Sequence, residues 1–289
     1  MLPVPYPASL PAHLVRAAVT AALSEDLGLA GDLTSQSVLA PEAELAAVMR
    51  TREAGVIAGL DLAEEAFRQS GSGVHFERLV GDGASVTAGT AIARIGGNAR
   101  QALSSERVAL NFVNHMSGIA SLTARFVAET AGTKARICDT RKTTPGLRAF
   151  EKYAVRCGGG SNHRYGLDTA ILIKDNHIAV AGGVAEAIAA ARAFAGHLTA
   201  IEVEVDTLDQ FAEALETGVE AVLLDNMSTD DLRHAVALNA GRVRLEASGG
   251  VRLETVRAIA ETGVDYISSS RITMAAIPLD IGLDMALTG

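Results

Sequence analysis

Short apolar runs recur at regular intervals in the second half of the chain. From about Ala135 onward, each run ends in a polar residue and is followed by a stretch in which apolar positions have helical spacing. The runs end at Asp139, Lys174, Glu204, Asp225, Ser248 and Ser270, and from Lys174 onward these ends lie 21 to 30 residues apart. That distance is the length of one strand plus one helix. Nearly continuous apolar strands that alternate with helices are typical of a parallel sheet.

Six such units favour a closed or nearly closed (β/α) barrel. An open, doubly wound sheet is the alternative, although no GxGxxG motif follows an early strand. In a barrel, the active site lies at the carboxyl ends of the strands. We therefore expect Lys174, Glu204, Asp225 and the turn Ser248–Gly250 to meet at one edge of the sheet.

The first third of the chain mixes helical and strand patterns. The pattern predicts a helix over Leu10–Leu27, capped by Ser9. Two strands are predicted over Glu44–Ile57 and Val74–Val80, with a helix over Asp61–Gln69 between them. A run of short strands is predicted over Gly81–Ile95. The last of these runs resembles half of a lipoyl-type β-sandwich. No Lys stands at its turn to carry a lipoyl group, so a structural β unit is the favoured interpretation.

A long helix is predicted over Ser104–Glu129, with Ser104 or Ser105 as its cap. Arg107 would then lie in the first turn, where a cation opposes the helix dipole at a cost of a few tenths of a kcal/mol. A surface Arg tolerates this cost. An Arg that faces a dianionic ligand would more than offset it.

Composition and charge exclude several classes of protein. The chain has 289 residues, 48% of them apolar, with no apolar run of the ~18 residues that a membrane span needs. Its beginning lacks the pattern of a signal peptide, and its two cysteines make no disulfide framework, so we expect a cytoplasmic protein. A net charge of −9 and the absence of Trp argue against a nucleic-acid partner.

Basic side chains are nevertheless concentrated in one segment of this acidic chain. Residues 134–174 hold nine of the 25 Lys and Arg residues but only three Asp or Glu. Glycines and histidine accompany these cations, next to apolar runs that we interpret as buried strands. A site for a small, multiply anionic ligand is the favoured interpretation, and a solvated charged surface is the alternative.

The predicted strand ends carry groups suited to such a ligand. The ammonium of Lys174 must either pair with a neighbouring strand end or contact an anionic ligand. Glu204 and Asp225 could hold Mg²⁺, accept hydrogen bonds from ribose hydroxyls or stabilise a developing positive charge. The turns at Ala247–Gly250 and Ser268–Arg271 could present backbone N–H groups to a phosphate, although such turns can also be merely tight.

Several longer motifs resemble those of one enzyme family, quinolinate phosphoribosyltransferase. The resemblance extends over nearly the whole chain and is most specific in DTRKTTPGLR and CGGGSNHRYGLDTAILIKDNH. The matching segments are Glu25–Gly28, Gly31–Ser35, Gly55–Leu60, Ser105–Ala120, Asp139–Arg148, Cys157–His177 and Glu202–Asp206, followed by LLDNM, LEASGG and GVDYIS.

This resemblance implies a fold and a reaction. The fold is α/β: an N-terminal α+β sandwich domain (residues 1–115, joined by the tail 275–289) and an irregular, incomplete (β/α) barrel of about six to seven parallel strands (116–274) that binds the phosphoribosyl group. The reaction is carboxylating phosphoribosyl transfer, in which quinolinate and phosphoribosyl pyrophosphate give nicotinate mononucleotide, pyrophosphate and CO₂, with Mg²⁺, in de novo NAD biosynthesis.

The resemblance also implies residue roles. Residues that match the quinolinate ligands are Arg107, Thr140, Arg141, His163, Arg164 and Lys174, with Arg107 donated by the neighbouring subunit of a homodimer. Those that match contacts of phosphoribosyl pyrophosphate are Lys142, Glu204, Asp225, Ser248, Gly249, Gly250, Ser269, Ser270 and Arg271. Lys142, Lys174, Glu204 and Asp225 match the catalytic set, and Glu204 and Asp225 the Mg²⁺ ligands. Arg forks suit the two adjacent carboxylates of quinolinate.

One segment departs from the family pattern. Many members have a VGALTH-like stretch after the last strand, where this chain has SSSRITM (Ser268–Met274), so that Ser270 replaces a Gly and Met274 a His. A backbone phosphate cradle survives a change of Gly to Ser unless that position needs a positive φ.

Three alternatives remain at this point. A molybdenum-transport-associated paralogue shares the fold, but the full basic set argues for the quinolinate enzyme. A barrel aldolase would use Lys174 to form a Schiff base. A non-catalytic binding or scaffold protein would not need Lys142, Glu204 and Asp225 together.

Overall fold

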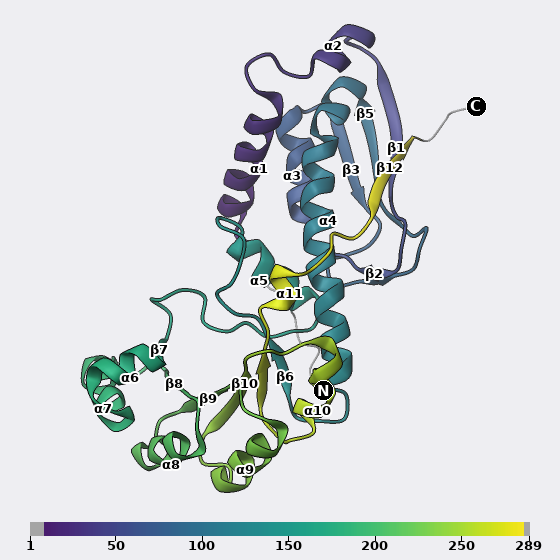
Figure 1. The fold of residues 1–289 in the computed structure, drawn as a ribbon. Coiled ribbons are helices and arrows are strands. Elements are labelled where there is room, and N and C mark those ends of the chain that lie inside the picture. The colour runs from purple at the N-terminus through teal and green to yellow at the C-terminus, as the bar shows by residue number, and fades with distance from the viewer. Residues whose placement is uncertain (1–8, 286–289) are drawn as a thin grey trace. The chain divides into compact units, whose positions relative to one another are not determined.

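A computed structural model describes residues 9–285, which form two compact units (Figure 1). Of the described residues, unit 1 comprises 9–122, Pro145–Gly159 and 276–285, and unit 2 comprises Thr123–Thr144 and Gly160–Ala275. The chain therefore leaves unit 1, returns to it for a short segment, and enters it again at the end. No helix of the described part is both long and apolar enough to cross a membrane by itself, and only the sharply bent pair Asp175–Ala181 and Val184–Phe194 reaches that length and composition together.

Unit 1 contains a four-stranded antiparallel sheet in the order β12-β1-β5-β3 and a two-stranded sheet of β2 and β4. Helix α1 packs on α3, and α3 packs on β3 (Figure 1). The elements of this unit are α1 (Ala12–Leu27), α2 (Leu33–Val38), β1 (Glu44–Thr51), β2 (Gly55–Val56), α3 (Leu60–Ser70), β3 (Val74–Arg78), β4 (Ser85–Val86), β5 (Ala91–Asn98), α4 (Ala99–Glu129, up to Leu122), α5 (Arg148–Cys157) and β12 (Ile281–Met285).

Within unit 1, part-buried polar contacts through Asp82 connect helix α5 to the start of α3. The Tyr153 hydroxyl donates to Asp82 Oδ2 at 2.9 Å, and the same carboxylate accepts from the backbone N–H groups of Gly59 and Leu60, where α3 begins. Burial raises the pKa of Asp82, and these hydrogen bonds to the ionised form oppose the shift. One carboxylate thus joins the start of α3 to α5.

Unit 2 contains six parallel strands in the order β6-β11-β10-β9-β8-β7. Its elements are β6 (Arg136–Cys138), β7 (Ile171–Ile173), α6 (Asp175–Ala181), α7 (Val184–Phe194), β8 (Ile201–Val205), α8 (Leu208–Thr217), β9 (Ala221–Asp225), α9 (Thr229–Asn239), β10 (Arg244–Ser248), α10 (Leu253–Ala260), β11 (Tyr266–Ser268) and α11 (Arg271–Met274). The prediction of an α/β chain with an incomplete parallel barrel is confirmed.

The barrel is open between β6 and β7, which pair with each other nowhere in residues 9–285. The segment between these two strands contains α5, and α5 belongs to unit 1. The chain between β6 and β7 therefore leaves unit 2 and contributes its helix to unit 1. A short bridge between Cys138 and Ser161 continues the sheet beyond β6.

Several predicted boundaries in unit 1 were wrong. Helix α1 begins after Pro11, which makes no side-chain cap, so Ser9 is not the cap. The strand predicted over Glu44–Ile57 is broken after Thr51, whose hydroxyl accepts from the backbone N–H of Glu53 in a turn. A two-residue strand then follows as part of the second sheet.

Helix α4 begins five residues earlier than predicted, at Ala99. The side chain of Asn98 accepts from the backbone N–H of Gln101, which is the contact of a capping residue. Ser104 and Ser105 instead lie inside the helix, and their hydroxyls donate to the carbonyls four residues before them. Arg107 is therefore beyond the first turn, and the dipole argument does not apply to it.

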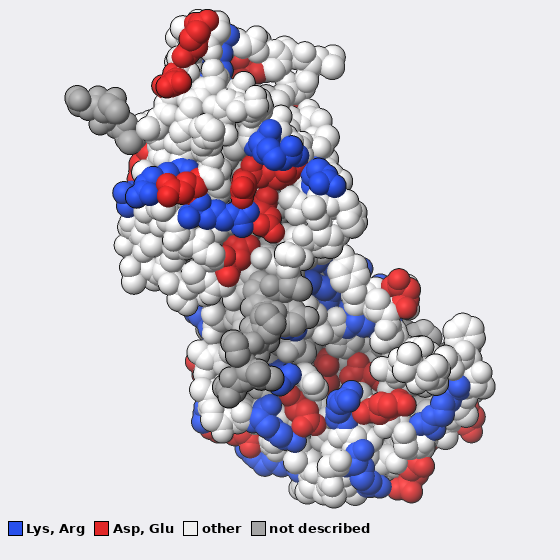
Figure 2. Space-filling model, turned by 180° about the vertical axis from the view of Figure 1, so that it is seen from behind, with Lys and Arg blue, Asp and Glu red and all other residues white. Residues whose placement is uncertain are grey.

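Charged side chains are interspersed on the face shown in Figure 2. Within unit 2, exposed pairs such as Arg233–Asp230 and Arg257–Glu261 place opposite charges together.

Candidate active site

A pocket of about 710 Å³ lies at the carboxyl ends of the strands of unit 2. Residues from β7, β8, β9, β10 and β11 and from the loops around them line it. The predicted site residues that meet in this pocket are Thr140, Arg141, Lys142, His163, Arg164, Lys174, Glu204, Asp225, Ser248, Gly249, Gly250, Ser269, Ser270 and Arg271. Leu172, Leu223 and Val251 add apolar surface.

Lys174 and Glu204 form an ion pair at the ends of the neighbouring strands β7 and β8. The Glu204 side chain is 12% exposed, whereas that of Lys174 is 45% exposed. The structural pairing considered as an alternative is therefore present. It leaves the ammonium open to the pocket, so Lys174 can also contact an anionic ligand.

Asp225 ends β9 beside this pair. Burial raises the pKa of its carboxyl, and repulsion from Glu204 and Asp206 adds to the shift, while Lys174 and Lys142 oppose it. Crowded carboxylates of this kind favour a cation between them. Glu204 and Asp225 offer hard oxygen ligands, so the donor set fits Mg²⁺.

Two arginines line the pocket on the side of the β6 and β7 loops. The Arg164 guanidinium donates to the carbonyl of Ala170 through Nη1, at 3.0 Å, whereas its buried Nε has no hydrogen-bond partner among residues 9–285. Burial lowers the pKa of Arg164, and the positive charge of Arg141 lowers it further. Two neighbouring guanidinium groups with an unused buried donor form a site for an anion with several oxygens.

The loop that carries His163 and Arg164 is held by Asp139, which is fully buried at the end of β6. Its two carboxylate oxygens accept from the backbone N–H of His163 at 2.9 Å and from the side-chain amide of Asn162 at 2.5 Å. Asp139 is thus a supporting residue that fixes the loop relative to the sheet.

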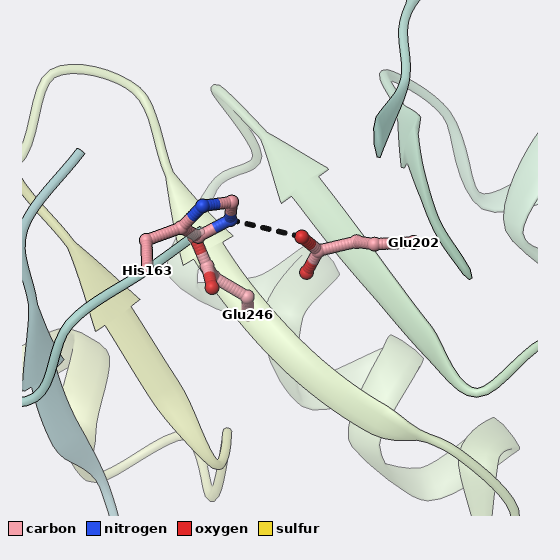
Figure 3. A group of neighbouring side chains, drawn as sticks. All are labelled: His163, Glu202 and Glu246. Carbon is pink, nitrogen blue, oxygen red and sulfur yellow. Dashed lines mark hydrogen bonds and ion pairs between the residues drawn. The ribbon is translucent and has the colours of Figure 1, made fainter. Parts of the chain in front are cut away.

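The His163 ring points down into the barrel, toward two glutamates (Figure 3). Its Nε2 lies 2.9 Å from an oxygen of Glu202 on β8 and 3.7 Å from Glu246 Oε1 on β10. Its Nδ1 accepts from the backbone N–H of Arg164 at 2.8 Å. Of these three side chains, His163 and Glu246 line the pocket together with the two arginines.

Sequence reasoning did not single out Glu202 or Glu246. Alternation along IEVEV could have identified the first, because Glu202 and Glu204 are partly exposed while Ile201, Val203 and Val205 are buried. Charged residues at every second position of a parallel strand indicate a face that lines a polar interior. Glu246 stands two residues before Ser248 on β10 and therefore shares the face of that pocket residue.

The turn after β10, for which a phosphate contact was predicted, is built around glycine. Gly249 has φ +85° and Gly250 has φ +60°, both in the left-handed region. A Cβ atom on Gly249 would lie 2.2 Å from Asn226 Oδ1 and 2.7 Å from the Asn226 backbone nitrogen. No other residue fits at position 249, and the backbone of this turn stays open to the pocket.

The divergent turn after β11 keeps a regular backbone. Ser270 has φ −71°, so the change from Gly to Ser brings no strain. The Ser269 hydroxyl donates to the carbonyl of Val251, and that of Thr273 donates to the carbonyl of Lys142 at 2.8 Å. Met274 is 59% exposed.

Arg107 does not line this pocket. It lies on α4, in unit 1, and is exposed. The predicted site residues of unit 2 are thus together, while the one residue expected from a neighbouring subunit is elsewhere on the chain.

Comparison with known proteins gives a consistent result along the whole chain. The model of the quinolinate phosphoribosyl transferase N-terminal domain matches residues 32–117, and that of the C-terminal domain matches residues 119–284. A probable nicotinate-nucleotide pyrophosphorylase [carboxylating] of Bacillus subtilis is 44% identical over 264 residues, 91% of each chain. The nicotinate-nucleotide pyrophosphorylase [carboxylating] of Mycobacterium leprae is 45% identical over 277 residues, covering 93% of this chain and 96% of its own.

Solved structures agree with these sequences. The nicotinate-nucleotide pyrophosphorylase from Francisella tularensis superimposes with a TM-score of 0.92 at 39% identity, covering 96% of this chain and 98% of its own. The Ehrlichia chaffeensis protein of the same name gives 0.89 at 42% identity, covering 93% and 97%.

Proposed function

Because the chain belongs to the quinolinate phosphoribosyltransferase family, we propose that the pocket of unit 2 binds quinolinate beside phosphoribosyl pyrophosphate and joins the two. The protein is a pentosyltransferase of NAD biosynthesis: it makes nicotinate mononucleotide, pyrophosphate and CO₂ from these substrates. The observation that carries the substrate assignment is the pair of neighbouring guanidinium groups, Arg141 and Arg164, in one pocket. Quinolinate presents two adjacent carboxylates, which two such forks can bind together.

The roles that we assign divide the pocket into two parts. Quinolinate contacts Thr140, Arg141, His163, Arg164 and Lys174. The phosphoribosyl donor contacts Lys142, Glu204, Asp225, Ser248, Gly249, Gly250, Ser269, Ser270 and Arg271. Lys174 lies where the two parts meet, since it pairs with Glu204 and remains half exposed.

Catalysis in this arrangement depends on position and charge. The pyridine nitrogen attacks C1 of the ribose, and the bond from C1 to pyrophosphate breaks with its electron pair on the leaving group. The ammonium groups of Lys142 and Lys174 stabilise that negative charge, while Glu204 and Asp225 stabilise the positive charge that develops on the ribose. No covalent enzyme intermediate forms.

Loss of CO₂ follows from the product of that step. The bond between C2 and its carboxylate breaks, and the electron pair remains at C2, where the adjacent pyridinium nitrogen stabilises it until a proton is taken up. The arginines bind both carboxylates and so hold quinolinate in one orientation relative to the ribose during the transfer. The 2-carboxylate must then leave its cationic contacts as neutral CO₂.

Mg²⁺ is part of this proposal. Glu204 and Asp225 would hold it, in part through water or substrate, and the repulsion between these carboxylates supports such a site. Bound Mg²⁺ would neutralise charge on the pyrophosphate. Activity is expected to disappear when the metal is chelated and to return when Mg²⁺ is restored.

We further propose a homodimer in which Arg107 of one subunit completes the quinolinate site of the other. This proposal is supported by the exposed position of Arg107 on α4, outside the lining of the pocket in its own chain. A cytoplasmic location is also proposed: neither Cys138 nor Cys157 forms a disulfide, as expected in a reducing compartment.

The function is tested by comparing quinolinate with nicotinate as acceptors of the phosphoribosyl group. Purified protein with phosphoribosyl pyrophosphate and Mg²⁺ is expected to form nicotinate mononucleotide from quinolinate and to leave nicotinate unchanged. Turnover of nicotinate alone would support the molybdenum-transport-associated paralogue instead. Trapping of Lys174 by borohydride with a carbonyl substrate would support an aldolase.

A further inference from the structure

The proposed function does not use two glutamates that lie next to His163. Glu202 and Glu246 come from strands β8 and β10 and approach the His163 ring from two sides (Figure 3), and Glu246 lines the pocket together with His163. One carboxylate oxygen of each glutamate and one ring nitrogen of His163 lie within 4.8 Å of one another. If both glutamates were ionised, two negative charges would oppose a dianionic ligand bound in this pocket.

The hydrogen bonds of His163 determine where its proton is. The backbone N–H of Arg164 can only donate, so Nδ1 accepts this bond and carries no proton. The ring proton is then on Nε2, which donates to Glu202 at 2.9 Å. In this arrangement the His163 ring is neutral, and Glu202 accepts its Nε2 proton.

Glu246 differs from Glu202 in that one of its carboxylate oxygens is buried without a donor among residues 9–285, although the Ser268 side chain hydrogen-bonds to the carboxylate. It is 6% exposed, and its Oε1 has no hydrogen-bond partner among the described residues. The charged and titratable groups that face it are Glu202 from β8, His163 from its loop and Asp139 from the end of β6. Burial, together with repulsion from Glu202, raises the pKa of Glu246 to about 7, while His163 and Ser268 act in the opposite direction.

We propose that Glu246 takes up a proton when the dicarboxylate substrate binds in the pocket, so that the pocket lining loses one negative charge in the complex. The proposal rests on the quinolinate site described above. Glu246 does not touch the substrate in this account. It is a positioning residue that, when protonated, has an O–H group to donate toward Glu202 and keeps His163 and Arg164 in place.

The sign of the pH dependence follows from linkage. A bound dianion favours the protonated form of Glu246, so the complex holds more protons than the free protein at pH 7 and above. The dissociation constant of quinolinate should be flat below pH 7. Above it, the constant should rise by up to about tenfold per pH unit until Glu246 also ionises in the complex.

Titration calorimetry on the whole protein tests this directly. Quinolinate is titrated at pH 7.5 in two buffers of different ionisation enthalpy, and the difference in heat gives the number of protons taken up. We expect a net uptake of up to one proton by the unaltered protein and none by Glu246→Gln, whose amide imitates the protonated acid. Glu216→Gln, an exposed pair partner of Arg242, is the matched control and should behave like the unaltered protein.

Each outcome is informative. Binding without proton uptake by the unaltered protein overturns the inference and leaves the proposed function intact. Uptake that persists in Glu246→Gln assigns the proton to another group and also overturns it. Failure of quinolinate to bind at all, with phosphoribosyl pyrophosphate still bound, rejects the substrate itself. In kinetics, Glu246→Gln should remove the rise of KM with pH while kcat stays within about threefold of the unaltered enzyme.

Discussion

Arg164 shows how far single residues could be predicted from the chain. Its place in the quinolinate site was predicted from a specific motif, and the structure places it in one pocket with Arg141 and the other predicted site residues of unit 2. The support beside it was not predicted, because the glutamates at positions 202 and 246 are far apart in sequence and meet only across the sheet, from strands β8 and β10 with β9 between them. Pairing of strands, rather than local pattern, brings such residues together.

Replacement of Arg164 by Ala should reduce kcat/KM for quinolinate by about 100-fold or more. The bound carboxylate would lose its fork in a desolvated site, a change that typically costs roughly 2–5 kcal/mol. Steady-state kinetics with varied quinolinate measures the effect. Arg233→Ala is the control, because Arg233 is exposed on α9 and pairs only locally with Asp230. Near-normal kinetics for Arg164→Ala would contradict the assignment.

At the scale of elements, the alternating pattern of unit 2 was predictable and the irregular parts were not. Strand ends at Asp225 and Ser248 were located correctly because nearly every apolar residue of these strands is buried. The start of α4 was missed because Asn98 caps a helix whose first residues carry no strong pattern. The return of α5 to unit 1 depends on the contact of Tyr153 with Asp82, which no local pattern reveals.

The turn after β10 gives a prediction at this scale. Gly249→Ala should raise the KM for phosphoribosyl pyrophosphate about tenfold or more, because the added Cβ would displace Asn226 and reshape the phosphate turn. Gly218→Ala is the matched control: Gly218 also has a positive φ, +69°, but nothing lies within 4 Å of its added Cβ. It should lose about 1 kcal/mol of stability with unchanged KM. Equal KM effects in both variants would show that backbone strain alone is responsible.

At the scale of the whole molecule, the proposal that matters most is the shared site. A single chain leaves Arg107 outside the pocket lining, and the sequence indicates a partner for it only through family resemblance. The charge distribution suits small anionic substrates, since four of the nine cations of residues 134–174, namely Arg141, Lys142, Arg164 and Lys174, line the pocket of an otherwise acidic protein. Such local focusing needs no basic surface elsewhere.

Mixing two inactive variants tests the shared site. Arg107→Ala and Arg164→Ala should each be nearly inactive. In a heterodimer of the two, one site has both arginines and the other has neither. After subunit exchange, random pairing should therefore restore about a quarter of the unaltered activity. An Arg107→Ala protein that is fully active, or a mixture that recovers nothing, would contradict donation across the interface.

The most direct test of the central claim follows the fate of one carboxylate. Quinolinate carrying a carbon isotope at its 2-carboxylate is incubated with the protein, phosphoribosyl pyrophosphate and Mg²⁺, and labelled CO₂ and nicotinate mononucleotide are measured together. The account predicts equal amounts of both, dependent on phosphoribosyl pyrophosphate and reduced at least 100-fold in Arg164→Ala, consistent with a loss of roughly 2–5 kcal/mol. Absence of labelled CO₂ while the protein still binds phosphoribosyl pyrophosphate would contradict it.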